Sequence, residues 1–167
     1  LPNPSRGRGL RRPAHRPVES QLTLRIRLLG PADAPALDRV ADGVFDGPVD
    51  PRWRDEFLTD PRHHLAVAVD GDTVVGMASA VHYLHPDKPP ELWVNEVGVA
   101  ASHRRRGLAR RVVEALLDHG RSLGCREAWV LTERTNAPAR ALYAAAGGTE
   151  EGDPVLVAFD LTGPAGS

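Results

Sequence analysis

The sequence predicts an α/β fold, one domain built on a mixed β-sheet, and two features of the chain carry this prediction. A strand-like run at 91–99 is followed by a glycine-containing turn and an amphipathic helix, as in a parallel crossover unit. Upstream, strand-like runs at 65–69 and 73–84 are joined by Asp70-Gly71-Asp72, a strong hairpin signal. Hairpins pair strands antiparallel and crossovers pair them parallel, so a sheet that combines both is expected to be mixed.

The N-terminal half of the domain supplies the first strand and two helices. Residues 22–29 alternate in hydropathy and predict a strand, which Gly30-Pro31 ends. An apolar stripe then predicts a helix that ends near Gly43, and it is formed by Ala34, Leu37, Val40 and Ala41. Asp50-Pro51 predicts the start of a second, shorter helix.

The C-terminal half begins with the long helix. Its apolar residues Leu108, Val112 and Leu116 follow helical spacing, and Gly124 is expected to end it. A buried strand is expected at 128–131. A short helix follows, with Asn136 as its cap, Pro138 in its first turn and Gly147-Gly148 at its end; 155–161 then predicts a last strand. The expected order is β-α-α-β-β-β-α-β-α-β(-β).

Composition restricts the class of protein. The 167 residues are 41% hydrophobic and 26% charged, which is typical of one soluble globular domain. No apolar run has the length of a transmembrane helix, and no signal-peptide core precedes the domain. Cys125 is the only cysteine, so we expect no intrachain disulfide and a cytoplasmic protein.

Charge is distributed unevenly along the chain. The first 20 residues carry five arginines and one glutamate, whereas the whole chain has a net charge of −1, so the rest is acidic. Residues 1–21 are expected to form a disordered basic tail or to be a remnant foreign to the natural protein; 22–161 form the domain and 162–167 a small-residue tail. An acidic domain favours a cationic small-molecule partner and argues against nucleic acid or a membrane.

The turn at 104–107 has the chemistry of an anion site. Arg104, Arg105 and Arg106 precede Gly107, where the long helix begins. A helix N-terminus exposes unpaired N–H groups and the positive end of its dipole, and a glycine lets an anion approach the backbone. The turn suits a pyrophosphate. It matches neither the dinucleotide pattern G-x-G-x-x-G nor a Walker A loop, and the alternative is an ordinary turn with solvated arginines.

Two motifs resemble those of a known enzyme family. Arg104-x-x-Gly107-x-Ala109 after V-G-V resembles motif A of the GNAT superfamily, the acetyl-CoA-dependent N-acetyltransferases, and Asn136-A-P-A-Arg140-A-L-Tyr143 resembles their motif B. The resemblance extends over 22–161 and implies the acyl-CoA N-acyltransferase fold, with acetyl-CoA as co-substrate and no metal. It implies cofactor contacts by Val97, Gly98, Val99, Arg104, Arg105, Arg106, Gly107, Leu108, Ala109, Arg110, Asn136 and Arg140.

The chemistry that the resemblance implies needs an acid and a base. Tyr143 would protonate the departing CoA thiolate, since a phenol has an ordinary pKa near ~10; alternatively it is a half-buried aromatic that packs its helix on the sheet. Strand alternation places Glu96 with Leu92 and Val94, so we expect a carboxylate among apolar neighbours with a raised pKa, acting as base directly or through water. Alternatively, Glu96 is a surface carboxylate. Backbone N–H groups of 97–99 would stabilise the oxyanion.

The acceptor is suggested by a closer resemblance. E-L-W-V-N-E-V-G-V-A-A-S-H-R-R-R-G-L-A, with A-L-Y and a closing V-A-F-D-L, resembles the aminoglycoside 3-N-acetyltransferases of GNAT type, which implies antibiotic resistance. A polycationic acceptor needs several carboxylates. Candidates are Asp46, Glu96, Glu150, Glu151, Asp153 and Asp160. Acceptors among protein, peptide or polyamine amines and a non-catalytic CoA-binding domain remain open, and the resemblance implies that the chain can form a homodimer.

Cysteine and histidine suggest no further chemistry. Cys125 lacks a motif-placed histidine and is interpreted as structural. The pairs His63-His64 and His82-x-x-His85 match no metal-binding spacing, so solvated or strand-edge histidines are expected.

Overall fold

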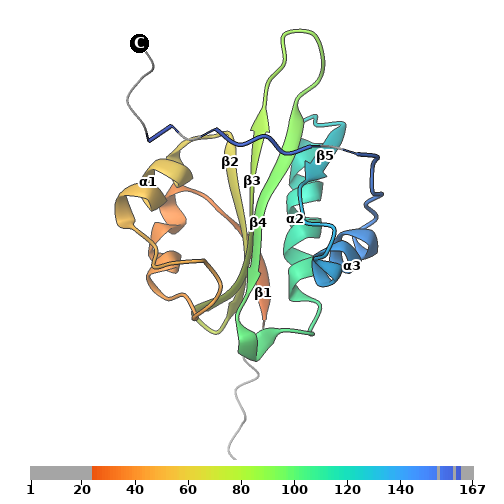
Figure 1. The fold of residues 1–167 in the computed structure, drawn as a ribbon. Helices are drawn as coiled ribbons and strands as arrows, with labels where there is room; N and C mark the ends of the chain where they lie inside the picture. The colour runs from red at the N-terminus through yellow and green to blue at the C-terminus, as the bar shows by residue number, and fades with distance from the viewer. Residues whose placement is uncertain (1–23, 154, 160, 163–167) are drawn as a thin grey trace, which may run out of the picture.

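The sheet of the protein is mixed, as the sequence predicts. The computed structural model describes residues 24–153, 155–159, 161 and 162. The strands are β1 (Arg25–Leu29), β2 (His63–Asp70), β3 (Thr73–Tyr83), β4 (Glu91–Val99) and β5 (Glu127–Val130), and they pair in that order. The first four are antiparallel neighbours, and β5 runs parallel to β4 (Figure 1).

Helices cover both faces of this sheet. One face carries η1 (Pro31–Asp38) and α1 (Pro51–Thr59), and the other carries α2 (Leu108–Ser122) (Figure 1). The short η2 (Ala101–His103) follows β4, and α3 (Ala137–Ala145) lies beside α2 beyond β5. Two hydrophobic cores result, one under α2 and one under η1 and α1.

Strand alternation separates the two cores. In β2, Ala66 and Ala68 face α2, whereas Leu65, Val67 and Val69 face η1 and α1. A small residue on α2 itself lets the helix approach the sheet closely. A Cβ on Gly120 of α2 would lie 2.9 Å from Cδ2 of Leu92 on β4. The predicted apolar stripe of α2 is confirmed.

A β-bulge at Asn95 changes which residues of β4 face α2. Ser79 pairs with Glu96 and Ala80 with Val94, so Asn95 is the extra residue. Val94 packs under α2 before the bulge, and Val97 does so after it. Glu96 therefore points to the η1 and α1 face and is exposed, so its predicted place among Leu92 and Val94 is wrong.

Three other predictions of secondary structure are corrected. The first helix is a 3-10 helix that ends at Asp38, because Pro35 lies inside it and the chain at Val40 bridges to Val74. Strand β5 is short and only half-buried at its C-terminal end, not a buried strand. Residues 155–159 and 161 form no strand, and their apolar side chains are exposed.

The predicted ends of several elements are confirmed. Asp50 caps α1, and its side chain accepts a hydrogen bond from Arg52 N at 2.8 Å. Asn136 caps α3 in the same way through Ala139 N at 3.2 Å. Gly71 and Gly124 adopt positive φ at the hairpin turn and after α2. None of the described helices is long and apolar enough to span a bilayer. The predictions for 1–21, Asp160 and 163–167 lie outside the described residues.

Candidate active site

Strands β4 and β5 separate halfway along β4 and leave an open edge. They pair only where 91–94 face 127–130, whereas β3 pairs with β4 along its length. Across the described chain, residues 96–99 therefore have a strand partner on one side only. A ligand with amide groups, such as a pantetheine arm, can pair with such an edge as a strand does.

The turn that follows β4 is held against the β2–β3 hairpin. His103 Nε2 lies 2.9 Å from Asp70 Oδ2, and Ser102 Oγ lies 2.8 Å from His103 Nδ1. Beyond this anchor, Arg105 has φ 61° and Gly107 has φ 72°, both in the left-handed region. These contacts fix the turn directly at the N-terminus of α2.

The N-terminus of α2 is open to an anion. Gly107 is its N-cap, and no side chain among the described residues caps it. Apart from the adjacent residues, no described atom lies within 4 Å of the position of a Gly107 Cβ. The side chains of Arg104, Arg105 and Arg106 are exposed around it. Free N–H groups and the positive end of the helix dipole therefore lie beside three exposed arginine residues.

Not every predicted cofactor residue can act through its side chain. Leu108 is buried in the core, so only its backbone can meet a ligand. Arg110 Nε donates to Glu114 at 2.6 Å, and Arg104 Nε donates to the Val99 carbonyl at 3.3 Å. A Cβ on Gly98 would lie 2.0 Å from the carbonyl oxygen of Val44, so this glycine is required by the crossing loop.

Helix α3 brings Tyr143 to the core under α2. Tyr143 is half-buried, packs against the cluster that contains Leu108, and its pKa is raised by burial. A raised pKa keeps the phenol protonated, as a proton donor requires. Arg140, predicted to contact the cofactor, is held by Glu150 at 2.6 Å and also donates to the Arg134 carbonyl.

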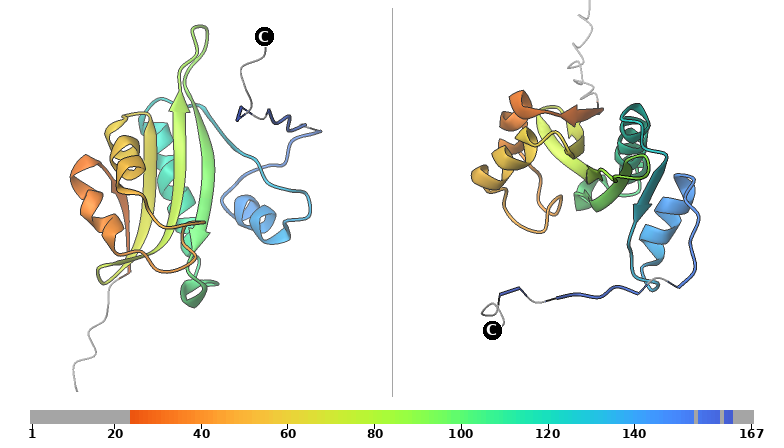
Figure 2. Two further views of the ribbon diagram at one scale, coloured as in Figure 1. Left: turned by 60° about the vertical axis from the view of Figure 1, so that its left-hand side comes forward. Right: turned by 90° about the horizontal axis from the view of Figure 1, so that it is seen from above.

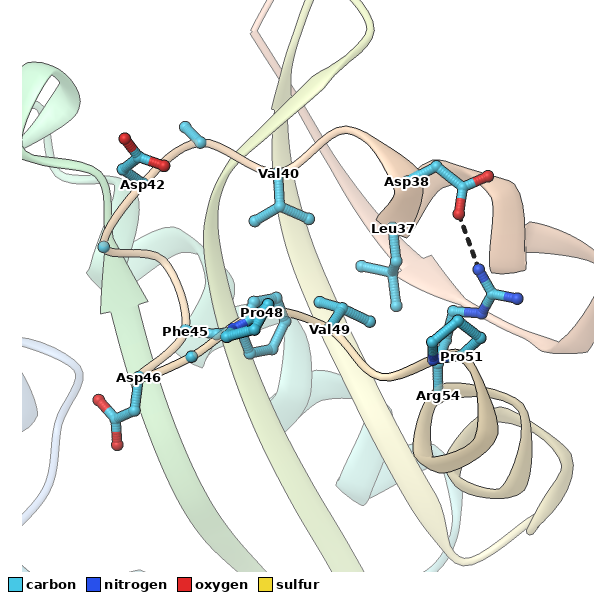
Figure 3. A pocket seen from close by; sticks show the side chains of 13 residues that line it. Leu37, Asp38, Val40, Asp42, Phe45, Asp46, Pro48, Val49, Pro51 and Arg54 are labelled. Carbon is cyan, nitrogen blue, oxygen red and sulfur yellow. Dashed lines mark hydrogen bonds and ion pairs between the residues drawn. The ribbon is translucent and has the colours of Figure 1, made fainter.

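The predicted acceptor carboxylates do not all meet. Glu96 and Asp46 are exposed, and Asp46 belongs to the loop that crosses β4 at Gly98. A cavity of about 630 Å³ lies under this loop, where Phe45 and Pro48 project over the strands and Asp46 extends outward (Figure 3). Glu151 and Asp153 are exposed in the segment after α3, and Asp160 is outside the described residues.

The prediction of solvated histidines is wrong for His64. It is only 7% exposed, and its Nε2 lies 2.8 Å from His82 Nδ1 while its Nδ1 lies 3.1 Å from His119 Nε2. Burial, followed by the charges of His119 and His82, lowers the pKa of His64 to about 4. In the described chain no group of three His, Cys, Asp or Glu residues could hold a metal ion.

The sequence did not predict one feature of the η1 and α1 face of the sheet. Trp93 and Trp129 stack on neighbouring strands, with ring centroids 4.9 Å apart. They are partners in the parallel register of β4 and β5, which no local sequence pattern reveals.

A family model for the acetyltransferase (GNAT) family matches residues 35–147. The chain belongs to the GNAT family. The match includes the turn at 104–110 and helix α3.

One curated relative is similar to part of this chain. It is 35% identical over 78 residues to the N-alpha-acetyltransferase RimI of Mycobacterium tuberculosis (strain ATCC 25618 / H37Rv), 47% of this chain and 49% of RimI. The matched region thus spans about half the length of that relative.

Solved structures share the fold. An aminoglycoside acetyltransferase, meta-AAC0020 from an uncultured soil metagenomic sample, in complex with sisomicin, has a TM-score of 0.73 at 18% identity, over 83% of this chain and 97% of that one. AAC(6')-Iy in complex with the bisubstrate analog CoA-S-monomethyl-acetylneamine has a TM-score of 0.67 at 20% identity, over 83% and 99%.

Proposed function

We propose that the protein transfers the acetyl group of acetyl-CoA directly to an amine of a cationic small molecule, an aminoglycoside. The observation that carries the proposal is the position of Glu96. The bulge at Asn95 turns this exposed carboxylate to the η1 and α1 face, beside the open edge of β4. A carboxylate there can hold an ammonium group next to a thioester that lies along the edge.

The cofactor would lie along a continuous path. Its pyrophosphate is held at the N-terminus of α2 by the backbone of 107–110 and by Arg104, Arg105 and Arg106. Its pantetheine amides pair with the edge of β4 at 97–99. Asn136 and Tyr143 border the arm from α3, which packs beside α2. Arg140 can contact the cofactor only if its hydrogen bond to Glu150 breaks.

The chemistry divides between two side chains and the backbone. Glu96 takes the ammonium proton, directly or through a water molecule, and the free amine attacks the thioester carbonyl. Backbone N–H groups at 97–99 stabilise the oxyanion. As the C–S bond breaks, the Tyr143 hydroxyl donates its proton to the CoA thiolate. The new amide nitrogen releases its surplus proton to solvent, and solvent returns a proton to Tyr143.

Three observations support a polycationic acceptor. The domain is acidic, and Glu96 and Asp46 are exposed on elements of the η1 and α1 face. Two proteins of the same fold are aminoglycoside acetyltransferases. Glu151, Asp153 and Asp160 would contribute to this site only if the segment after α3 folds over it.

A second acceptor class has one specific observation in its favour. The partial similarity to RimI favours an N-terminal amine of a protein. A peptide would lie in an open groove, and its affinity for the enzyme would depend little on the number of carboxylates in the acceptor site.

The experiment is a panel measurement of CoA release with sisomicin, gentamicin, spermidine and short peptides. The proposal expects turnover with the aminoglycosides. Turnover with peptides alone would instead show that the acceptor is a protein amine.

The variant Glu96→Gln keeps size and hydrogen bonding but cannot take a proton. We expect a lower kcat and the loss of the acidic limb of the kcat/KM profile, with Glu56→Gln on α1 as control. A raised KM at unchanged kcat would limit Glu96 to binding.

A further inference from the structure

An exposed aromatic surface lies on the η1 and α1 face, at the end of β4 that is paired with β5. Trp93 and Trp129 stack with an interplanar angle of 12°, and Trp93 remains 36% exposed. Helices η1 and α1 pack mainly on β1, β2 and β3, away from the edge that β4 and β5 form (Figure 2). A large aromatic surface left in water is a feature of binding sites.

Hydrogen bonds fix the orientation of the Trp129 ring. Trp129 Nε1 donates to the Tyr83 hydroxyl at 3.0 Å, and that hydroxyl donates to Glu91 Oε2 at 2.7 Å. Lys88 binds the same carboxylate and, with the Tyr83 hydrogen bond, lowers the pKa of Glu91 to about 2. The indole N–H of Trp129 and the charge of Glu91 are thus satisfied within the protein. The stacked faces of the two indoles cover each other, so a ligand would contact the part of the Trp93 side chain that remains exposed.

Carboxylates flank the pair on both strands. In β4, Val94 points to α2, so Trp93 and Glu96 share the opposite face across the bulge. In β5, Glu127 is exposed two residues before Trp129 and therefore shares its face. Negative charge beside an indole face favours a cation, because the ring face is itself negative.

We infer that the Trp93–Trp129 pair binds a cationic sugar ring of the acceptor, next to the ring that reacts at Glu96. This rests on the proposed function. Trp93 and Glu96 lie about 7–10 Å apart along the strand, a span that one or two linked sugar rings cover. The saturated ring packs on the indole, and its ammonium group lies near the ring face and Glu127.

The first test separates acceptor binding from catalysis. Trp93→Leu keeps an apolar side chain but removes the indole face. We expect the KM for sisomicin to rise roughly 3- to 30-fold, with kcat and the KM for acetyl-CoA nearly unchanged. Trp93→Phe retains a ring and should restore part of the affinity. Trp53→Leu is the matched control, because Trp53 is 58% exposed on α1 and already lies under Arg52.

The second test does not require turnover. The chain has three tryptophans, so its indole N–H groups give three NMR resonances that single variants assign. Adding sisomicin to the CoA-bound protein should shift the resonances of Trp93 and Trp129 and leave that of Trp53 in place. Unchanged Trp93 and Trp129 resonances, or a sisomicin Kd within about twofold of wild type in both Trp93 variants, would overturn the inference.

The two hypotheses fail in different ways. If the wild type releases no CoA with any aminoglycoside, the proposed function fails, while the NMR titration still decides whether a cationic sugar occupies the pair. If sisomicin is acetylated but Trp93→Leu and Trp93→Phe keep the wild-type KM, the function stands. The tryptophan pair is then a cross-strand packing contact only.

Discussion

Helices α2 and α3 lie side by side, yet they are held very differently. Helix α2 buries Leu108, Val112, Val113, Leu116 and Gly120 against the sheet. None of the nine residues of α3 is buried, and its contacts reach the core mainly through half-buried Tyr143. The site for the cofactor phosphates is thus built on a core helix, whereas the proposed acid is carried by a peripheral one.

The strands repeat this contrast. Strand β4 pairs with β3 along its length but with β5 over four residues, and the segment 155–159 crosses in front of the sheet without forming a strand (Figure 1). A rigid half therefore presents the anion site, and a loosely packed C-terminal part carries Tyr143. Local stability follows packing, so α3 should open more readily than α2.

The largest effect is expected at the start of the core helix. Gly107→Glu places bulk and a negative charge in the open anion site, so CoA binding should fall below detection in calorimetry. Gly152→Glu adds the same charge where no atom of the described residues lies within 4 Å of the Cβ position, and this variant should bind CoA normally. Unchanged CoA affinity in folded Gly107→Glu would remove the anion site from α2.

The next effect concerns the peripheral helix. Tyr143→Phe removes only a hydroxyl, so steady-state turnover should fall ~100- to 10000-fold. CoA affinity and Tm should change little, because the ring still packs against the core. Wild-type turnover would mean that water or another group protonates the thiolate.

Stability should distinguish the two halves directly. Leu116→Ala removes a fully buried side chain under α2 and should lower the free energy of unfolding by about 2–5 kcal/mol. Leu156→Ala changes a residue that is 78% exposed and should stay within about 0.5 kcal/mol. Chemical denaturation measures both, and equal losses would contradict the contrast between core and periphery.

The smallest effect is the pH dependence at the other end of α2. His64, on β2, contacts His82 of β3 and His119 of α2, with His63 and Asp60 near it. Its pKa of about 4 lies below the ordinary 6.5, so the folded state binds fewer protons. The neutral, buried His64 therefore contributes fully to the free energy of unfolding above pH 6.5. This contribution, on the order of 2 kcal/mol, is lost as the pH falls to 4. His64→Gln should flatten this slope in denaturation measured from pH 7.5 to 4.5.

Local signals predicted the elements of this fold well. Asp50, Gly71 and Asn136 define their ends through hydrogen bonds or backbone angles formed within a few residues. The apolar stripe of α2 and the glycine-containing turn before it could be predicted from the sequence in the same way. These features depend on spacing along the chain, which the sequence contains.

Features that depend on the pairing of distant segments were not predictable. The bulge at Asn95 moved Glu96 to the other face, because an extra residue reverses strand alternation. Apolar content at 155–161 suggested a strand, but a strand also needs a partner edge. The stacking of Trp93 on Trp129 follows from the parallel register of two strands that are separated by a helix.

Contact between Gly98 and Val44 has a kinetic consequence. The loop that carries Asp46 lies backbone against backbone on the strand where the pantetheine arm would bind, with no side chain between them. A displacement of β4 by the first substrate would move the loop that meets the second. We therefore expect each substrate to change the dissociation constant of the other, so that double-reciprocal initial-rate lines intersect to the left of the vertical axis and away from the horizontal one.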